Sequence, residues 1–182
     1  MQLKFCVFLF CLCFTAATPA WASDDSKHKH AHTHEHGAHV HGLAKLDVAV
    51  EANTLNLHLA TPLEGVLGFE HAPRNDKERA AVLAMRQKLN AAATLFAPTS
   101  AAQCVLASVQ IEAPSLEAKA AAGHADLDAH FLFNCAQADK LTGVEVRLFK
   151  AFPNMRRIDA QVVSAKGQKA KRLSSRMRFL SW

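Results

Sequence analysis

The sequence has no apolar run long enough to cross a membrane as a helix. A spanning helix needs about 20 apolar residues, and the longest run, at residues 5–14, is much shorter. It follows the positive charge of Lys4 and precedes Ala-Trp-Ala at residues 20–22, which is typical of a secretory signal peptide. We therefore expect cleavage after Ala22, removal of residues 1–22, and an exported, soluble mature protein without stable membrane insertion.

Catalytic motifs are also missing. The sequence contains neither a GxSxG nucleophile elbow nor an HExxH metalloprotease pair, and its seven glycines are scattered rather than gathered in a phosphate-binding loop. The formal net charge is +5 at pH 7, but an exported protein rarely meets its own nucleic acid. We expect a protein that is not an enzyme and has no nucleic-acid partner.

Cysteine is scarce once the signal peptide is removed. Of the five cysteines, only Cys104 and Cys135 lie outside it. In an oxidising compartment an isolated pair is typical of a disulfide. The alternative, two cysteine ligands for zinc, would need thiols kept reduced outside the cytoplasm. The pair therefore predicts a disulfide, which would stabilise the fold by roughly 3–4 kcal/mol in the chain-entropy description.

Histidine is the residue that the sequence has in excess. Seven of the eleven histidines fall in HKHAHTHEHGAHVHG, residues 28–42. Neutral imidazole binds Zn²⁺, Ni²⁺ and Cu²⁺, and a flexible tract offers many ligand arrangements of modest affinity because each capture orders the chain. A pH-responsive tail is the alternative, whereas the position and the interruptions argue against a purification tag. The metal ligands predicted in this tract are His28, His30, His32, His34, His36, His39 and His41.

The remaining sequence predicts a disordered segment followed by one domain. Residues 23–38 have no apolar periodicity and should be disordered without metal. From residue 39 to residue 182 we expect a single domain. It begins with alternating apolar residues that predict a hairpin around Ala52-Asn53, in which Val50 faces Leu55.

Further patterns extend this domain. A helix is predicted over residues 75–96, with Asn75 at its start, and strands over residues 104–112 and 124–135. Residues 139–152 fit a helix or a strand, and we favour the helix. A last hairpin turns at Lys166-Gly167. The expected fold class is α+β, a mostly antiparallel sheet with two helices packed on it, in the order ββα-ββα-ββ.

Potential metal ligands also occur inside the expected domain. His124, Asp126, Asp128 and His130 share one face of their strand, either as a metal site or as an ordinary solvated face. The hairpin register places His58 opposite Asp47, a carboxylate that would orient the imidazole. His71 lies in a loop, where a structural role and a ligand role are both open. The candidate ligands of the domain are His58, His71, His124, Asp126, Asp128 and His130.

Basic residues gather near the end of the chain, between residues 156 and 178. A solvated strand face explains them, and so does contact with an acidic partner or lipid. This second reading defines a rival hypothesis, in which the protein is a non-catalytic envelope interaction module that uses its basic C-terminal hairpin.

Four stretches resemble the ZrgA-like zinc-uptake proteins of Gram-negative periplasms: HGAHVHGLAKLDVAVEANTL, GFEHAP, FNC and EVRLFKAFP. The resemblance covers nearly the whole mature chain. It implies a periplasmic protein, made under zinc starvation, that binds Zn²⁺ and assists the high-affinity zinc ABC importer or its binding protein. The resemblance also implies metal ligands in the histidine tract and at His71, and a disulfide between Cys104 and Cys135.

One departure from that family pattern bears on the number of metal ions. Family members often hold a long second tract of His, Asp and Glu before the Phe-rich strand, where this chain has only EAKAAAGHADLDAH. The departure lowers the number of zinc ions we expect. Binding of Ni²⁺ or Cu²⁺ stays an alternative, because imidazole does not select zinc by affinity.

Overall fold

The structure is a computed structural model, and it describes residues 40–116 and 125–182. The chain divides into two units, Met1–Glu35 and His36–Trp182, and all described residues belong to the second. The predicted signal peptide and the histidine tract as far as His39 lie outside the described residues. Within the described ranges, no helix is long and apolar enough to cross a membrane.

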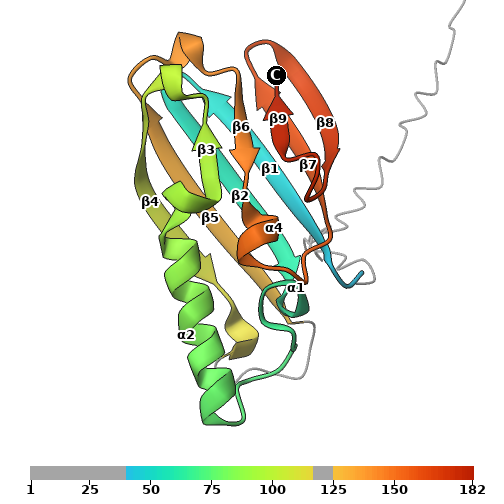
Figure 1. Cartoon of the computed structure of the whole chain (residues 1–182). Helices are drawn as coiled ribbons and strands as arrows, with labels where there is room; N and C mark the ends of the chain where they lie inside the picture. The colour runs from blue at the N-terminus through green and yellow to red at the C-terminus, as the bar shows by residue number, and fades with distance from the viewer. Residues whose placement is uncertain (1–39, 117–124) are drawn as a thin grey trace, which may run out of the picture. The chain divides into compact units, whose positions relative to one another are not determined.

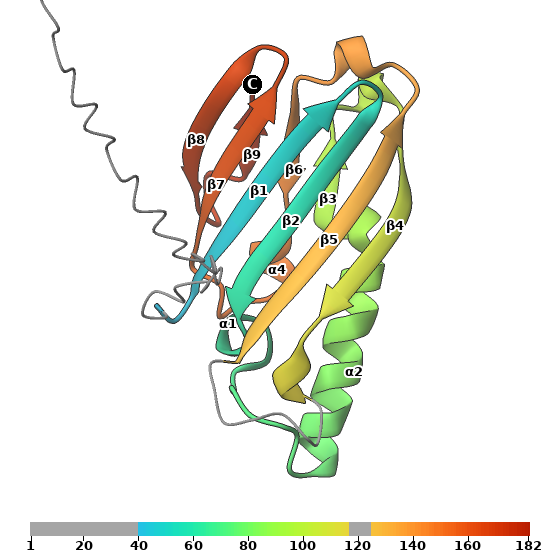
Figure 2. The same ribbon diagram turned by 180° about the vertical axis from the view of Figure 1, so that it is seen from behind.

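A six-stranded sheet forms the frame of this unit (Figures 1 and 2). Its strands run in the order β4-β5-β2-β1-β7-β8, and every neighbouring pair is antiparallel except β1 and β7, which are parallel. The strands are β1 (Leu43–Glu51), β2 (Thr54–Pro62), β4 (Cys104–Glu112), β5 (Asp126–Cys135), β7 (Arg157–Ser164) and β8 (Gly167–Leu173).

The predicted first hairpin is confirmed in its register. Val50 pairs with Leu55, and Asp47 pairs with His58. This register puts all the leucines of β2 on the buried face. The turn requires a positive φ of 48° at Ala52, a conformation that costs energy for a residue with a Cβ. Burial of the apolar face therefore sets the register, although Ala52 disfavours the positive φ that this register requires.

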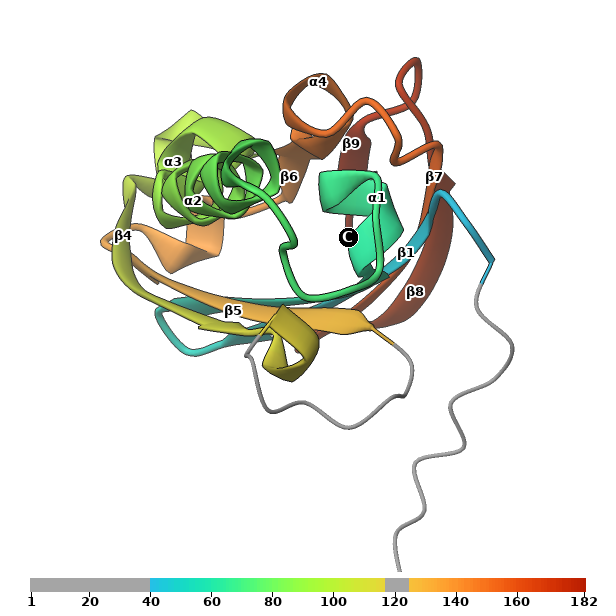
Figure 3. The ribbon, with the colours of Figure 1, turned by 90° about the horizontal axis from the view of Figure 1, so that it is seen from below.

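One face of this sheet is covered by four α-helices and a second, three-stranded sheet (Figure 3). The second sheet has the order β3-β6-β9. Its strands are β3 (Phe96–Pro98), β6 (Gly143–Val146) and β9 (Phe179–Ser181), and the helices are α1 (Leu63–Leu67), α2 (Asp76–Asn90), α3 (Ala92–Leu95) and α4 (Leu148–Ala151). Single 3₁₀ turns occur at Ser100–Ala102, Pro114–Leu116 and Ala138–Lys140.

The hydrophobic core fills the space between the six-stranded sheet and this cover. Phe131 on β5 and Phe96 on β3 contact each other with ring centroids 4.9 Å apart, and both are almost fully buried. Met85 and Leu89 of α2 pack onto the same core. No α-helix of the described residues covers the other face of the sheet (Figure 2). Side chains on that face, such as Gln110, Glu112 and His130, are exposed.

The α+β class and the mostly antiparallel sheet are confirmed, but parts of the predicted order are wrong. Residues 139–152 form the strand β6 and then the one-turn helix α4, instead of a single helix. The predicted helix over residues 75–96 ends at Asn90, and its last residues continue as α3 and β3. Both errors have one cause. Strand β6 pairs with β3 on one side and with the C-terminal β9 on the other, and local periodicity does not show such distant pairing.

The predicted disulfide is confirmed. Cys104 and Cys135 are joined, and they face each other across β4 and β5. The bond closes a loop with a sequence separation of 31. It attaches the edge strand β4 to its neighbour β5.

We expect removal of the disulfide to lower the stability of the fold strongly. In oxidised protein, a thiol titration under denaturing conditions should find no free thiol on these two residues. The Cys104→Ser, Cys135→Ser double variant should lose roughly 3–4 kcal/mol, seen as a fall of about 10 °C in the melting temperature. Scanning calorimetry measures this, with the reduced wild type as the matched control. Equal melting temperatures for the oxidised and reduced wild type would contradict the prediction.

Candidate metal site

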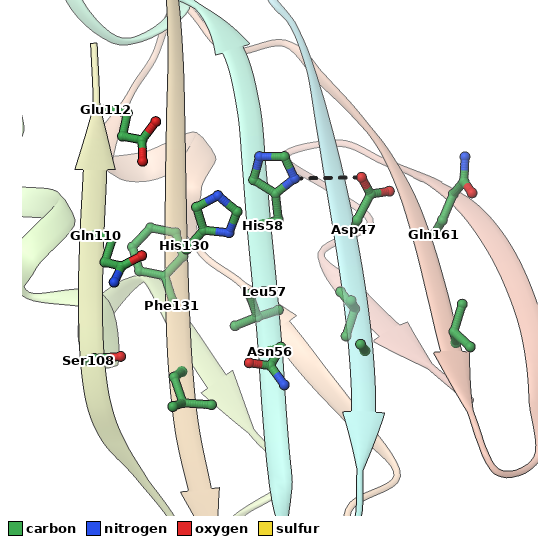
Figure 4. A pocket seen from close by; sticks show the side chains of 14 residues that line it. Asp47, Asn56, Leu57, His58, Ser108, Gln110, Glu112, His130, Phe131 and Gln161 are labelled. Atoms are coloured by element: carbon green, nitrogen blue, oxygen red, sulfur yellow. Dashed lines mark ion pairs between the residues drawn. The ribbon is translucent and has the colours of Figure 1, made fainter. Parts of the chain in front are cut away.

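Two histidines lie side by side on the solvent face of the six-stranded sheet (Figure 4). His58 of β2 and His130 of β5 are directly paired in the register of these strands. Their rings are stacked, with centroids 4.2 Å apart and planes within 3° of parallel. Asp47 of β1 lies on the other side of His58. One row across the sheet thus carries two imidazoles and a carboxylate.

The alternation of side chains explains why these residues face outward. On β2, the neighbours of His58 are Leu57 and Leu59, which are at most 1% exposed. On β5, the neighbours of His130 are Ala129 and Phe131, also buried. Because successive side chains of a strand point to opposite faces, burial of these neighbours drives both imidazoles to solvent. The pairing of β2 with β5 then brings the rings together.

Carboxylates approach both ring nitrogens of His58. Its Nε2 lies 2.8 Å from Oδ1 of Asp128, a hydrogen bond, and its Nδ1 lies 3.9 Å from Oδ2 of Asp47. Asp128 in turn faces Glu112 of β4 in the strand register. Two carboxylates directly opposite each other are unfavourable, and a bound cation would relieve that repulsion. The electrostatics of this face favour a positive ion.

A hollow of about 580 Å³ spans this face, and further polar side chains line it. Glu112 is the residue that sequence reasoning missed as a potential ligand. Its signal was present, because the polar residues of β4 alternate with apolar ones, but the pairing of β4 with β5 was needed to place them beside His130. The other polar residues lining the hollow are Asn56, Ser108, Gln110 and Gln161.

The donors are close together but not arranged as a finished metal site. Among the described residues, no group of three or more His, Cys, Asp or Glu side chains has a geometry that could hold a metal ion. The stacked rings explain this, since the nitrogen lone pairs of two parallel imidazoles lie in two separate parallel planes, while ligands of zinc must converge on one point. The hydrogen bond from His58 also occupies Asp128. Binding would require both rings to tilt.

The remaining predicted ligands lie elsewhere. His41 is exposed, and its Nε2 is 3.7 Å from Oε1 of Glu70. His71 lies in a loop, where its Nδ1 is 3.0 Å from the carbonyl oxygen of Ala72 and 3.9 Å from Oε2 of Glu78. Asp126 shares the outer face of β5 with Asp128 and is partly buried. His124 lies outside the described residues, as do the histidines at positions 28 to 39.

Glu78 next to His71 has a pKa below its ordinary value of 4.5. The main cause is a hydrogen bond of 2.7 Å from the backbone N–H of Arg74. Burial opposes this effect in part, while the side chain of Asn75 and the charge of His71 lower the pKa further. Asn75 accepts a bond from the Glu78 N–H in return. This reciprocal capping starts α2 and fixes the loop that carries His71.

The fold and the site together define an α+β protein whose ligand-type side chains lie on an open sheet face. The model of the ZrgA family, described as zinc uptake proteins, matches residues 38–182. The chain therefore belongs to the ZrgA family of zinc uptake proteins. A comparison with curated proteins found no match. The family match supports a role in zinc uptake, and it covers all the described residues.

The lowered pKa of Glu78 predicts a pH-dependent contribution to stability. A carboxylate with a depressed pKa stabilises the fold above its unfolded-state pKa, and this contribution is lost as the pH falls through the lower folded-state pKa. Glu78→Gln should therefore be less stable than wild type at neutral pH, and the difference should shrink as the pH falls below 4.5. Urea unfolding across this range measures it, with Glu51→Gln as the surface-charge control. A difference that is unchanged in acid would refute the assignment.

Proposed function

We propose that the protein is a periplasmic zinc-binding accessory protein that captures or buffers Zn²⁺ and assists a high-affinity zinc importer. Membership of a zinc-uptake family supports this proposal. The observation that carries it is the stacked pair His58 and His130, flanked by Asp47, Asp128 and Glu112 on a face open to solvent. Zinc is the cargo of this site.

The two groups of histidines have different tasks in this proposal. The tract before residue 42 supplies many imidazoles in a short stretch, which favours rapid capture in many arrangements. Each capture must order a new piece of chain, so the affinity of each arrangement is modest. The pair on β2 and β5 is held by the sheet before metal arrives. Less entropy is lost there on binding, and we expect the tighter site at this pair.

The geometry indicates how the pair takes up zinc. Zinc binds imidazole nitrogen at about 2.0–2.1 Å with tetrahedral angles, so a lone pair of each ring must point at the same ion, which the stacked, parallel rings do not allow. The rings of His58 and His130 tilt toward each other, and Nε2 of His58 exchanges its bond with Asp128 for the ion. Asp128 is then available as a third ligand. Asp47 remains beside Nδ1 of His58 and fixes the orientation of that ring.

The open face suits transfer rather than permanent storage. Three protein ligands leave one tetrahedral position for water, for Glu112, or for a ligand from another protein. Side chains on a solvent face are accessible to such a ligand. A buried four-ligand site would instead hold the ion firmly. We therefore infer a site that releases its ion to a partner in the uptake system.

Zinc titration of a truncated protein tests the division of tasks. Deleting residues 28–36 should leave the fold intact, because this stretch contains no apolar residue larger than alanine, and should lower the number of ions bound. One tighter site should remain. Adding His58→Ala and His130→Ala should abolish that site, whereas Gln161→Ala on the same face should retain it. Isothermal calorimetry with Zn²⁺, Ni²⁺ and Cu²⁺ measures the stoichiometry and affinity.

Each alternative gives a different result in that titration. If the truncated protein binds no zinc, all the zinc ligands lie in the histidine tract and the proposed site at His58 and His130 is wrong. If truncation leaves zinc binding unchanged, the tract is not a ligand set. If only Ni²⁺ or Cu²⁺ binds to the pair at physiological concentration, the protein handles one of those metals instead.

A growth assay tests the uptake role itself. In the source organism, deletion of this gene should impair growth when a chelator limits zinc. Added zinc should restore growth, and added nickel should not. The His58→Ala, His130→Ala variant should complement the deletion less well than wild type, with Gln161→Ala as the matched control. Normal growth of the deletion strain under chelation would contradict a role in zinc uptake.

A further inference from the structure

A second hollow, also of about 580 Å³, lies over the three-stranded sheet. This sheet buries Val144, Val146 and Leu180 in the core. The intervening residues Glu145 and Phe179 therefore point away from the core and line the hollow. The three-stranded sheet covers the face of the six-stranded sheet (Figure 3) that buries Leu57 and Phe131, so the hollow lies on the opposite side of the core from His58 and His130.

Arginine dominates the charge of this hollow. Arg147, Arg176 and Arg178 line it together with a single carboxylate, that of Glu145. Arg147 donates two bonds to Oε2 of Glu145, at 3.0 and 2.8 Å, and Arg178 approaches Oε1 at 3.3 Å. Glu145 thus holds two guanidinium groups in place. Arg176 makes no hydrogen bond or ion pair with any other residue in the part of the chain that the structure describes.

The floor of the hollow is apolar. Phe179 is 46% exposed, and its ring lies so close to Gly143 that a Cβ there would be 2.6 Å from the ring. Ala97 and Pro98 continue this floor, and hydroxyl groups of Thr99 and Thr142 stand beside it. Arginine and an exposed aromatic ring in one hollow are the composition of protein-binding hot spots.

We propose that this hollow docks an acidic segment of a partner protein. Guanidinium groups bind carboxylates in a planar, two-point geometry. Glu145 sits among the arginines and repels a compact anion such as phosphate from the centre. Carboxylates spaced along an extended segment avoid it, one reaching Arg176 and another the outer side of Arg147 or Arg178. Apolar side chains between them contact Phe179.

The docking surface operates independently of the proposed zinc site. Because the two faces are separated by the core, the protein could hold a partner at the arginine hollow while zinc occupies the pair of histidines. The proposal does not depend on which metal the protein carries. An experiment that refutes the docking surface therefore leaves the zinc site untouched, and an experiment that refutes the zinc site leaves the docking surface untouched.

Fluorescence anisotropy with a labelled peptide of alternating glutamate and alanine tests this proposal on the full mature chain. A chelator removes metal, so that ions on the histidine tract do not attract the peptide. Saturable binding is expected. Arg176→Glu should weaken it by about tenfold or more, equivalent to at least about 1.4 kcal/mol. Lys169→Glu on β8, which makes the same change in net charge, should weaken it by less than about twofold.

Further binding measurements distinguish an acidic peptide from phosphate and from lipid. Phe179→Ala should also weaken peptide binding. Inorganic phosphate should not displace the peptide. In a variant that lacks residues 28–36, the affinity for the peptide should be the same with added zinc and no chelator as it is with the chelator. Equal effects of Arg176→Glu and Lys169→Glu would overturn the proposal, and so would the absence of saturable binding. Arg176-dependent binding to phosphatidylglycerol vesicles without peptide binding would overturn it in favour of lipid. Thermal unfolding confirms that each variant folds, and Arg176→Gln replaces the reversal if it does not.

Discussion

The candidate site depends on one constraint, the alternation of side chains along β2 and β5. The leucines of β2 and the phenylalanines of β5 must be buried together, and this fixes the register between the two strands. Once Leu57 faces Phe131 in the core, His58 and His130 have to meet on the other face. A shift of β5 by one residue would bury His130 and turn the phenylalanines of β5 toward solvent. The packing that stabilises the sheet is therefore also what assembles the pair.

The same sheet leaves the two faces of the unit with different chemistry. Its solvent face gathers imidazole and carboxylate groups around His58, while the three-stranded sheet on the far side presents arginines around Phe179. A face rich in carboxylates attracts a cation, and a face rich in guanidinium groups attracts an acidic protein. This separation fits an accessory role in which metal and partner are held at the same time. In the proposed function it also keeps the arginines away from the zinc ion, which they would repel.

The sequence was sufficient for features that depend on local pattern. The register that pairs Val50 with Leu55, the start of α2 at Asn75 and the Cys104–Cys135 bond follow from alternation, capping and the count of cysteines. Other features depend on pairing between distant segments. The parallel contact of β1 with β7, the small sheet that includes residues 143–146, and the position of Glu112 beside Asp128 needed the structure. Of the predicted ligands on one strand face, Asp126, Asp128 and His130 do share the outer face of β5, and His124 lies outside the described residues. The stacking of His58 on His130 requires a strand pair that local periodicity does not specify.

The central claim is that His58 and His130 bind the same zinc ion. Two-dimensional proton–nitrogen NMR of the histidine side chains tests this most directly, on protein that lacks residues 28–36. Addition of one equivalent of Zn²⁺ should move the ring-nitrogen signals of His58 and His130 together, in slow exchange, and leave His71 in place. If the signals of His41 or His71 move first while those of the stacked pair stay unchanged, the zinc site lies elsewhere and the account is wrong.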